Sequence, residues 1–268
     1  MSTTEIPAAL VKELRDLTGA GMMDCKRALV ETGGDLEAAR QLLREKGLAE
    51  AGKRAGRETT EGRVVARVQD GEGAIAAVGC ETEPVSGNEE FRDFVQHVLD
   101  VVSVEGPAAA ESLEEERVEL VAKLGENIVV IGAERYEANR DGEVVADYIH
   151  PPAQKIGVLV RAKSTPELAR MVAMHVAAAK PTYLTRDEVP AGEVAEERAV
   201  YEKLPDVESK PDEVRGKIVE GMLAKRFFAQ MVLLDQAWVH DPNLTVGQAL
   251  AERDAEVRAF VRYNVGAE

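Results

Sequence analysis

The chain has 268 residues, a formal net charge of −16 and 45% hydrophobic residues. That length suggests about two domains, and the apolar content is sufficient to bury a core. A protein that binds duplex nucleic acid without sequence preference needs a surplus of Lys and Arg, so the acidic surplus argues against direct nucleic-acid binding.

Residues 7–50 have the periodicity of three short helices. Apolar side chains recur every three or four residues, at Leu10, Val11, Leu14 and Leu17, at Met22, Met23, Cys25, Ala28 and Leu29, and at Leu36, Ala39, Leu42 and Leu43. Gly19 and Gly47 are expected to end the first and third helices, and Asp35 to cap the third. We predict a three-helix module over residues 1–52, followed by a polar linker over 53–60.

A strand hairpin is predicted next, at the start of a first α+β half over residues 61–140. Arg63–Val68 alternates apolar and polar side chains, Asp70-Gly71 is typical of a tight turn, and Ala74–Val78 supplies the second strand. Residues 80–88 are rich in turn formers and are expected to form a loop. Two helices should follow, one with an apolar stripe from Phe91 to Val102 and one from Leu113 to Leu124.

A similar pattern returns in residues 141–268, the predicted second half. Gly142–Asp147 resembles Gly62–Arg67, a second apolar strand follows at Gly157–Val160, and a helix begins after Thr165. Two strand–strand–helix units indicate duplicated halves of one body, with a chance match as the alternative.

Residues 187–228 interrupt the second half with two helical stretches, about 192–204 and 211–228, on either side of a Pro-bounded turn. They predict an antiparallel helical hairpin, in effect a short coiled coil. The chain then returns with a short strand at 237–239, a helix at 246–252 and a last strand at 257–265. The predicted fold class is α+β, with an N-terminal three-helix module, a two-part core with antiparallel sheets and an inserted helical hairpin.

Motifs for covalent or metal chemistry are missing from the sequence. It contains no GxxxxGK[ST], HExxH or CxxC pattern, and its four histidines are scattered singly, at His97, His150, His175 and His240. Cys80 follows an apolar strand and is expected to be a buried thiol. Glu81 and Glu83 are expected to be solvated rather than a catalytic pair. We therefore expect no enzyme activity, no metal and no cofactor.

Features that report on location point to the cytoplasm. No apolar run approaches the ~20 residues that span a bilayer, and the N-terminus lacks the basic and apolar regions of a signal peptide. The two cysteines form no CxxC pair, which is typical of a reducing compartment. We expect a soluble cytoplasmic protein that does not bind membranes.

One long N-terminal run closely resembles bacterial elongation factor Ts: Val11 to Lys26, VKELRDLTGAGMMDCK. Shorter matches continue in order along the chain, at Glu115–Val118, Lys123–Ile128, Met174–Ala178, Ile218–Gly221, Thr245–Gln248 and Phe260–Gly266. The resemblance implies an N-terminal module like a ubiquitin-associated (UBA) domain, two related α+β halves and an inserted coiled coil. It also implies a translation factor that promotes GDP release from the GTPase elongation factor Tu.

The resemblance also identifies candidate partner contacts. The family's Thr-Asp-Phe-Val loop, which intrudes near the partner's magnesium site, corresponds to Thr82, Glu83, Pro84 and Val85. Glu83 keeps the negative charge, whereas Pro84 replaces an aromatic side chain. Other matching contact positions are Lys12, Arg15, Met22, Met23, Lys26, Leu124, Gly125 and His150.

Each candidate also has a structural explanation. Met22 could belong to a helix core, Lys12 and Arg15 to a solvated face, Leu124 and Gly125 to a helix terminus, and His150 could be an ordinary surface histidine. His175 lies on an apolar helix face and is expected to be structural.

Three functions are weighed: an exchange factor, a divergent relative that binds elongation factor Tu with weakened exchange because of Glu83-Pro84, and a small-molecule enzyme on a similar fold. The missing catalytic motifs count against the enzyme. A homodimer or a 2:2 complex with the partner stays open.

Overall fold

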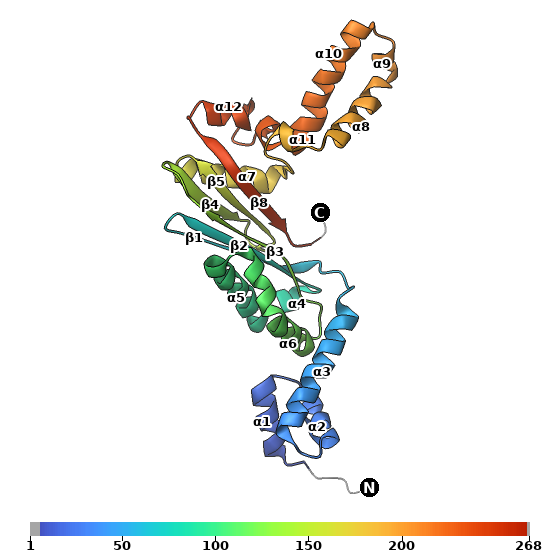
Figure 1. Cartoon of the computed structure of the whole chain (residues 1–268), viewed down its shortest axis with the longest axis vertical. Helices are drawn as coiled ribbons and strands as arrows, with labels where there is room; N and C mark the ends of the chain where they lie inside the picture. The colour runs from blue at the N-terminus through green and yellow to red at the C-terminus, as the bar shows by residue number, and fades with distance from the viewer. Residues whose placement is uncertain (1–5, 267–268) are drawn as a thin grey trace.

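The computed structural model describes residues 6–266 of the chain. Three parts follow one another along the long axis: a small helical module near the N-terminus, a body built on two three-stranded sheets with a small β6-β7 sheet, and a projecting helical hairpin (Figure 1). Within residues 6–266, none of the helices has both the length and the apolar character required to cross a membrane. The division of the chain at residues 52, 60 and 140 stays a prediction.

The N-terminal module consists of α1 (Ala8–Thr18), α2 (Met22–Glu31) and α3 (Leu36–Arg54). Its small core is formed by Val11, Leu14, Cys25, Ala28, Leu29 and Ala39. Gly19 ends α1 in the left-handed conformation, and the Asp35 side chain accepts a hydrogen bond from the backbone N–H of Ala38. Both predicted helix boundaries are confirmed.

The predicted end of the third helix at Gly47 is wrong. α3 continues to Arg54, into the expected linker, because a glycine inside a helix costs only about 1 kcal/mol and α3 packs closely against α6 (Glu114–Leu124). A Cβ atom on Gly47 would lie 3.1 Å from the Cβ of Ala122. Gly47 thus permits a close helix contact rather than ending the helix.

The first half of the body is a three-stranded antiparallel sheet in the order β1-β2-β3, covered by helices. Its elements are β1 (Glu61–Gln69), β2 (Glu72–Cys80), α4 (Glu83–Ser86), α5 (Glu89–Glu105), the 3-10 helix η1 (Pro107–Leu113), α6 and β3 (Val129–Glu137). The hairpin prediction is confirmed. The third strand was not predicted, and the expected loop at 80–88 contains the short helix α4.

The second half repeats this plan, with a sheet in the order β4-β5-β8. Its elements are β4 (Glu143–Ile149), β5 (Ile156–Lys163), α7 (Pro166–Ala179), β6 (Ala237–Trp238), β7 (Asp241–Thr245), α12 (Val246–Ala251) and β8 (Glu256–Asn264). β7 was not predicted. The helical hairpin inserted between α7 and β6 contains α8 (Ala191–Glu202), α9 (Pro205–Glu208), α10 (Asp212–Met222), a π-helical turn (Leu223–Phe228) and α11 (Ala229–Met231), with 3-10 turns at Arg186–Glu188 and Leu233–Asp235.

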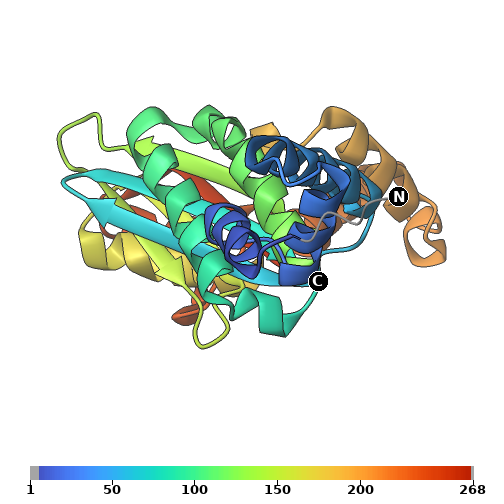
Figure 2. The same ribbon diagram turned by 90° about the horizontal axis from the view of Figure 1, so that it is seen from below.

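The two sheets pack face to face, with helices on their outer surfaces (Figures 1 and 2). Successive side chains of a strand point to opposite faces. In β2, Ala74, Ala76, Val78 and Cys80 therefore face α5 and α6, while Ile75 and Ala77 face the second sheet. A strand buried on both faces has a continuous apolar sequence, as residues 74–78 have.

Glycines let the two sheets approach each other. A Cβ atom on Gly73 would lie 2.5 Å from a methyl group of Val145, and one on Gly157 would lie 2.4 Å from a methyl group of Val64. These separations are far below van der Waals contact, so only glycine, which has no side chain, fits at either position.

Candidate functional site

The segment Thr82–Val85 begins two residues after the end of β2; Thr82 is the N-cap of the short helix α4, and Glu83, Pro84 and Val85 are its first three residues. Pro84 occupies the first turn of α4, where its missing N–H costs nothing and its fixed φ suits the helix. Thr82, Glu83 and Pro84 are exposed, whereas Val85 is half-buried against the core of the first half. The segment therefore exposes three residues while Val85 packs against the body of the protein.

Glu126 holds the start of this segment from across the fold. Its Oε2 accepts hydrogen bonds from the backbone N–H groups of Glu81 (3.1 Å) and Thr82 (3.0 Å), and its Oε1 accepts one from Thr82 Oγ1 (2.5 Å). Glu126 is placed there by Gly125, which ends α6 with φ of 75°. Leu124 and Gly125 thus form a helix terminus beside the segment, which agrees with the structural explanation given for them. A contact between these two residues and a partner remains a prediction.

The side chains of Cys80 and Glu81 have structural roles. The Cys80 thiol is buried and donates to the Thr82 carbonyl; burial, aided by the nearby Glu126 charge, raises the pKa of this thiol to about 12. Desolvation raises the pKa of Glu81, but hydrogen bonds from the Asn127 N–H and from Arg57 outweigh it, so the net pKa is lowered. The buried thiol was predicted; a paired acid–base role for Glu81 and Glu83 has no support.

His150 lies at the end of β4 and is exposed, as predicted. Its Nδ1 is 2.9 Å from Tyr148 Oη, and the chain then turns through a cis Pro151-Pro152 bond toward β5. The backbone carbonyl of Gln154, in the same turn, accepts a hydrogen bond from the N–H of Val64 in β1 (2.7 Å). This turn therefore packs against the end of the first sheet.

Arg63 connects the two candidate regions. Its Nε donates to the carbonyl of Ser86 (2.9 Å), at the end of α4, and its Nη1 donates to Oε1 of Gln154 (2.5 Å). The structure thus brings Thr82–Val85, Gly125 and the turn after His150 to one end of the two sheets. Sequence reasoning missed Arg63 and Glu126; the position of Glu126 directly after Leu124-Gly125 was the one available signal.

The remaining candidates lie apart, in the N-terminal module (Figure 1). Lys12, Arg15, Met22, Met23 and Lys26 are all exposed. Met22 is 56% and Met23 62% accessible, so the explanation of Met22 as helix core is wrong. Two exposed methionines side by side in the sequence suit a partner surface, and that role stays a prediction.

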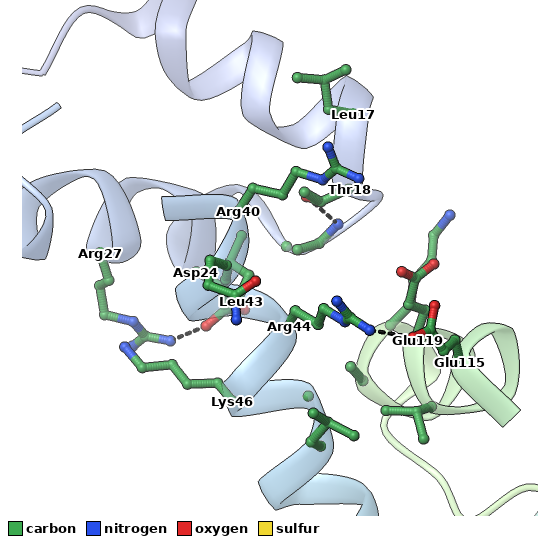
Figure 3. Close-up of a pocket in the computed structure, with 18 of the residues that line it drawn as sticks. Leu17, Thr18, Asp24, Arg27, Arg40, Leu43, Arg44, Lys46, Glu115 and Glu119 are labelled. Atoms are coloured by element: carbon green, nitrogen blue, oxygen red, sulfur yellow. Dashed lines mark hydrogen bonds and ion pairs between the residues drawn. The ribbon is translucent and has the colours of Figure 1, made fainter. Parts of the chain in front are cut away.

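A groove of about 1090 Å³ lies beside the contact between α3 and α6, lined by the N-terminal module and α6 (Figure 3). Its lining mixes charges of both signs, including Asp24, Arg27, Arg40, Arg44, Glu115 and Glu119. An ion pair between Arg44 and Glu115 joins the module to the body. The mixed charge favours a hydrated junction rather than a site for an ion of one sign.

Metal and nucleophile chemistry receive no support from the described residues. Among residues 6–266, no group of three or more His, Cys, Asp or Glu side chains is placed to hold a metal ion. His175 is fully buried, stacks on Trp238 and lies 3.0 Å from Gln236 Oε1 through its Nε2, while its Nδ1 accepts from the N–H of Val239. Its predicted structural role is confirmed.

Comparison with known proteins places these features in a family. The family model described as "Elongation factor TS" matches residues 81–267. Curated proteins named "Elongation factor Ts" are similar over nearly the whole chain. One from Vibrio cholerae serotype O1 is 43% identical over 265 residues, covering 97% of this chain and 92% of the relative. One from Shewanella amazonensis is 44% identical over 265 residues, covering 97% and 91%, and one from Haemophilus influenzae is 42% identical over 266 residues, covering 98% and 92%.

Proposed function

Because the chain belongs to the elongation factor Ts family, we propose that it binds elongation factor Tu in its GDP-bound form and promotes the release of GDP. The family makes the chain a translation elongation factor. The finer claim, that it acts by disturbing the partner's magnesium and phosphate site, is supported by one observation above all: an exposed Thr82–Pro84 segment fixed beside Gly125 and the turn after His150.

Exchange by this route requires a coupling free energy rather than covalent chemistry. The factor must bind the nucleotide-free GTPase more tightly than the GDP-bound form, and GDP binding is then weakened by the same factor. A segment that occupies or distorts the partner's nucleotide site supplies such a difference. The negative Glu83, exposed on this segment, would compete electrostatically with phosphate for a bound cation. We accordingly propose that the protein is not an enzyme in the usual sense and acts in the cytoplasm.

Pro84 is the feature that favours the alternative function, a relative with weakened exchange. Burial of a phenylalanine side chain is worth about 1.5–3 kcal/mol, and the smaller proline ring buries less area. The N-terminal methionines, Gly125 and His150 remain available for contact, so we expect exchange to persist.

Stopped-flow release of a fluorescent GDP from the cognate elongation factor Tu tests both functions. We expect a rate that rises with added factor and reaches a plateau; no acceleration at saturating factor would refute the exchange function. A large gain on Pro84→Phe would instead favour the weakened relative. Light scattering of the complex would separate a 1:1 assembly from a 2:2 assembly.

A further inference from the structure

The Thr82–Val85 segment is short and mostly exposed, and only Val85 packs against the core of the first half. Its conformation therefore depends on groups outside it. At its start, the carboxylate of Glu126 accepts three hydrogen bonds, two from backbone N–H groups and one from the Thr82 hydroxyl. We propose that Glu126 is the positioning residue that fixes this segment for its partner, an inference that rests on the proposed exchange function.

The location of Glu126 explains why a carboxylate suits this role. β2 ends at Cys80, so the N–H groups of Glu81 and Thr82 lie just beyond the paired strand residues. Backbone donors need a partner, and hydrogen bonds to an ionised carboxylate are about twice as strong as neutral ones. One side chain from the turn after α6 thus satisfies both donors and sets the direction in which the chain leaves the sheet.

A reciprocal contact holds Glu126 itself in place. Oε1 of Glu81 accepts from the N–H of Asn127 (2.6 Å), the residue after Glu126. The buried Asn127 side chain donates to the carbonyl of Arg57 (2.8 Å), and Arg57 Nη1 donates to Oε2 of Glu81 (3.3 Å). Glu126 therefore projects from a turn that is itself bonded to Glu81, the residue before the segment.

Fixing the segment in advance matters because ordering it on binding would consume part of the interaction free energy. A loose segment would still allow binding through the N-terminal module, but it would transmit less of that binding to the nucleotide site. Loss of positioning should thus lower the rate of GDP release at saturating factor more than it raises the half-saturating concentration. A merely destabilised protein would show the opposite, because added factor restores the plateau.

The test uses the full-length chain with three substitutions. Glu126→Ala removes all three acceptors. Glu126→Gln keeps an oxygen for both N–H groups and can donate to the Thr82 hydroxyl, so it should rescue the geometry. Glu119→Ala, at an exposed glutamate of α6, the helix that precedes Glu126, is the matched control. Each protein is assayed for release of fluorescent GDP from elongation factor Tu over a range of factor concentrations, and for amide hydrogen exchange.

We expect Glu126→Ala to lower the plateau rate about tenfold, with less than about a threefold change in half-saturating concentration, as the loss of hydrogen bonds to a charged group implies. Exchange of the Glu81 and Thr82 amides should rise about tenfold or more, while the β2 amides stay protected. Glu126→Gln should lie within about threefold of the wild type in both assays, and Glu119→Ala should match it.

Two results would overturn the inference: unchanged exchange of the Glu81 and Thr82 amides in Glu126→Ala, or faster exchange of these amides with an unchanged plateau rate. Failure of the wild-type protein to release GDP is a separate result. It would remove the proposed function, and with it any functional role of Glu126, while the amide data would still show whether Glu126 holds the segment.

Discussion

The turn after β2 and the turn after β4 lie at the same end of the two sheets, but they are held differently. Charged side chains anchor the first at both ends, Glu126 at Thr82 and Arg63 at Ser86. The second is held at Gln154, by Arg63 and by the N–H of Val64, and it presents His150, whose ring lies 2.9 Å from Tyr148 Oη. Similar strand–strand–helix plans have therefore produced one segment bonded by charged side chains at both ends and one turn held through Gln154, from which His150 projects.

The difference follows from how the halves face each other. Gly157, at the start of β5, lies against Val64 near the start of β1, whereas Gly73, at the start of β2, lies against Val145 near the start of β4. The corresponding strands thus run in opposite directions. The end of β2, which leads into α4, therefore lies beside the turn between β4 and β5. The two halves thus contribute different kinds of segment to the same end of the sheets.

The largest expected effect is a loss of folding stability on filling the two close contacts between the sheets, and it tests whether the two halves pack equivalently there. Gly73→Val and Gly157→Val each add a side chain where a Cβ atom alone would overlap a neighbour. Overpacking of this kind should lower the free energy of unfolding by about 3 kcal/mol, measured by urea denaturation.

Gly216→Ala, at an open position in α10, is the control and should raise stability by about 0.5–1 kcal/mol. Tolerance of valine at one of the two sheet positions alone would show that the halves do not pack equivalently.

Loss of Arg63 should uncouple the two turns. Arg63→Ala removes the hydrogen bonds to Ser86 and Gln154, and we expect the plateau rate of GDP release to fall by the equivalent of about 2 kcal/mol. A double-mutant cycle with Gln154→Ala isolates the link between the turns; additive effects would contradict it.

Tyr148→Phe should have a smaller effect, because it removes a single hydrogen bond to His150 and keeps the ring. We expect about 1 kcal/mol, read as a fall in the rate of GDP release. The substitution should have no further effect in a His150→Ala background. An equal loss in that background would mean that Tyr148 acts independently of His150.

The smallest expected effect is a dependence of folding stability on pH that arises from His175, a buried group of the second half. Burial lowers the pKa of His175 in the second half, partly opposed by its bond to Gln236 and reinforced by His240. The unfolded state, with a histidine pKa of about 6.5, then binds the proton first. Stability from this group is complete above about pH 6.5 and is lost as the pH falls below it, by at most about 1.4 kcal/mol per pH unit.

Urea denaturation between about pH 5.5 and 7.5 measures this dependence across the histidine range. His175→Phe keeps an aromatic ring against Trp238 and should flatten the curve. A slope as steep as that of the wild type would assign the effect to other groups.

Local pattern predicted much of the fold. The helical stripes from Leu10 to Leu43, the Asp35 cap, the Asp70-Gly71 hairpin and the buried Cys80 and His175 all follow from residue type and spacing. Strand β3 escaped prediction because Gly132 and three charged residues, Glu134, Arg135 and Glu137, break its alternation. It becomes a strand through pairing with β2, and Gly132 gives room to the ring of Tyr263.

The sequence by itself determined most of the buried faces, the order of the longer helices and of the strands other than β3 and β7, the lack of catalytic motifs and, through resemblance, the family. Tertiary structure alone decided that α3 runs past Gly47 onto α6, that Met22 points outward, and that Glu126 and Arg63 hold a segment distant in sequence. The physical reason is that burial is encoded in short-range periodicity, whereas the partner of a polar side chain depends on which remote backbone groups the packing leaves unsatisfied.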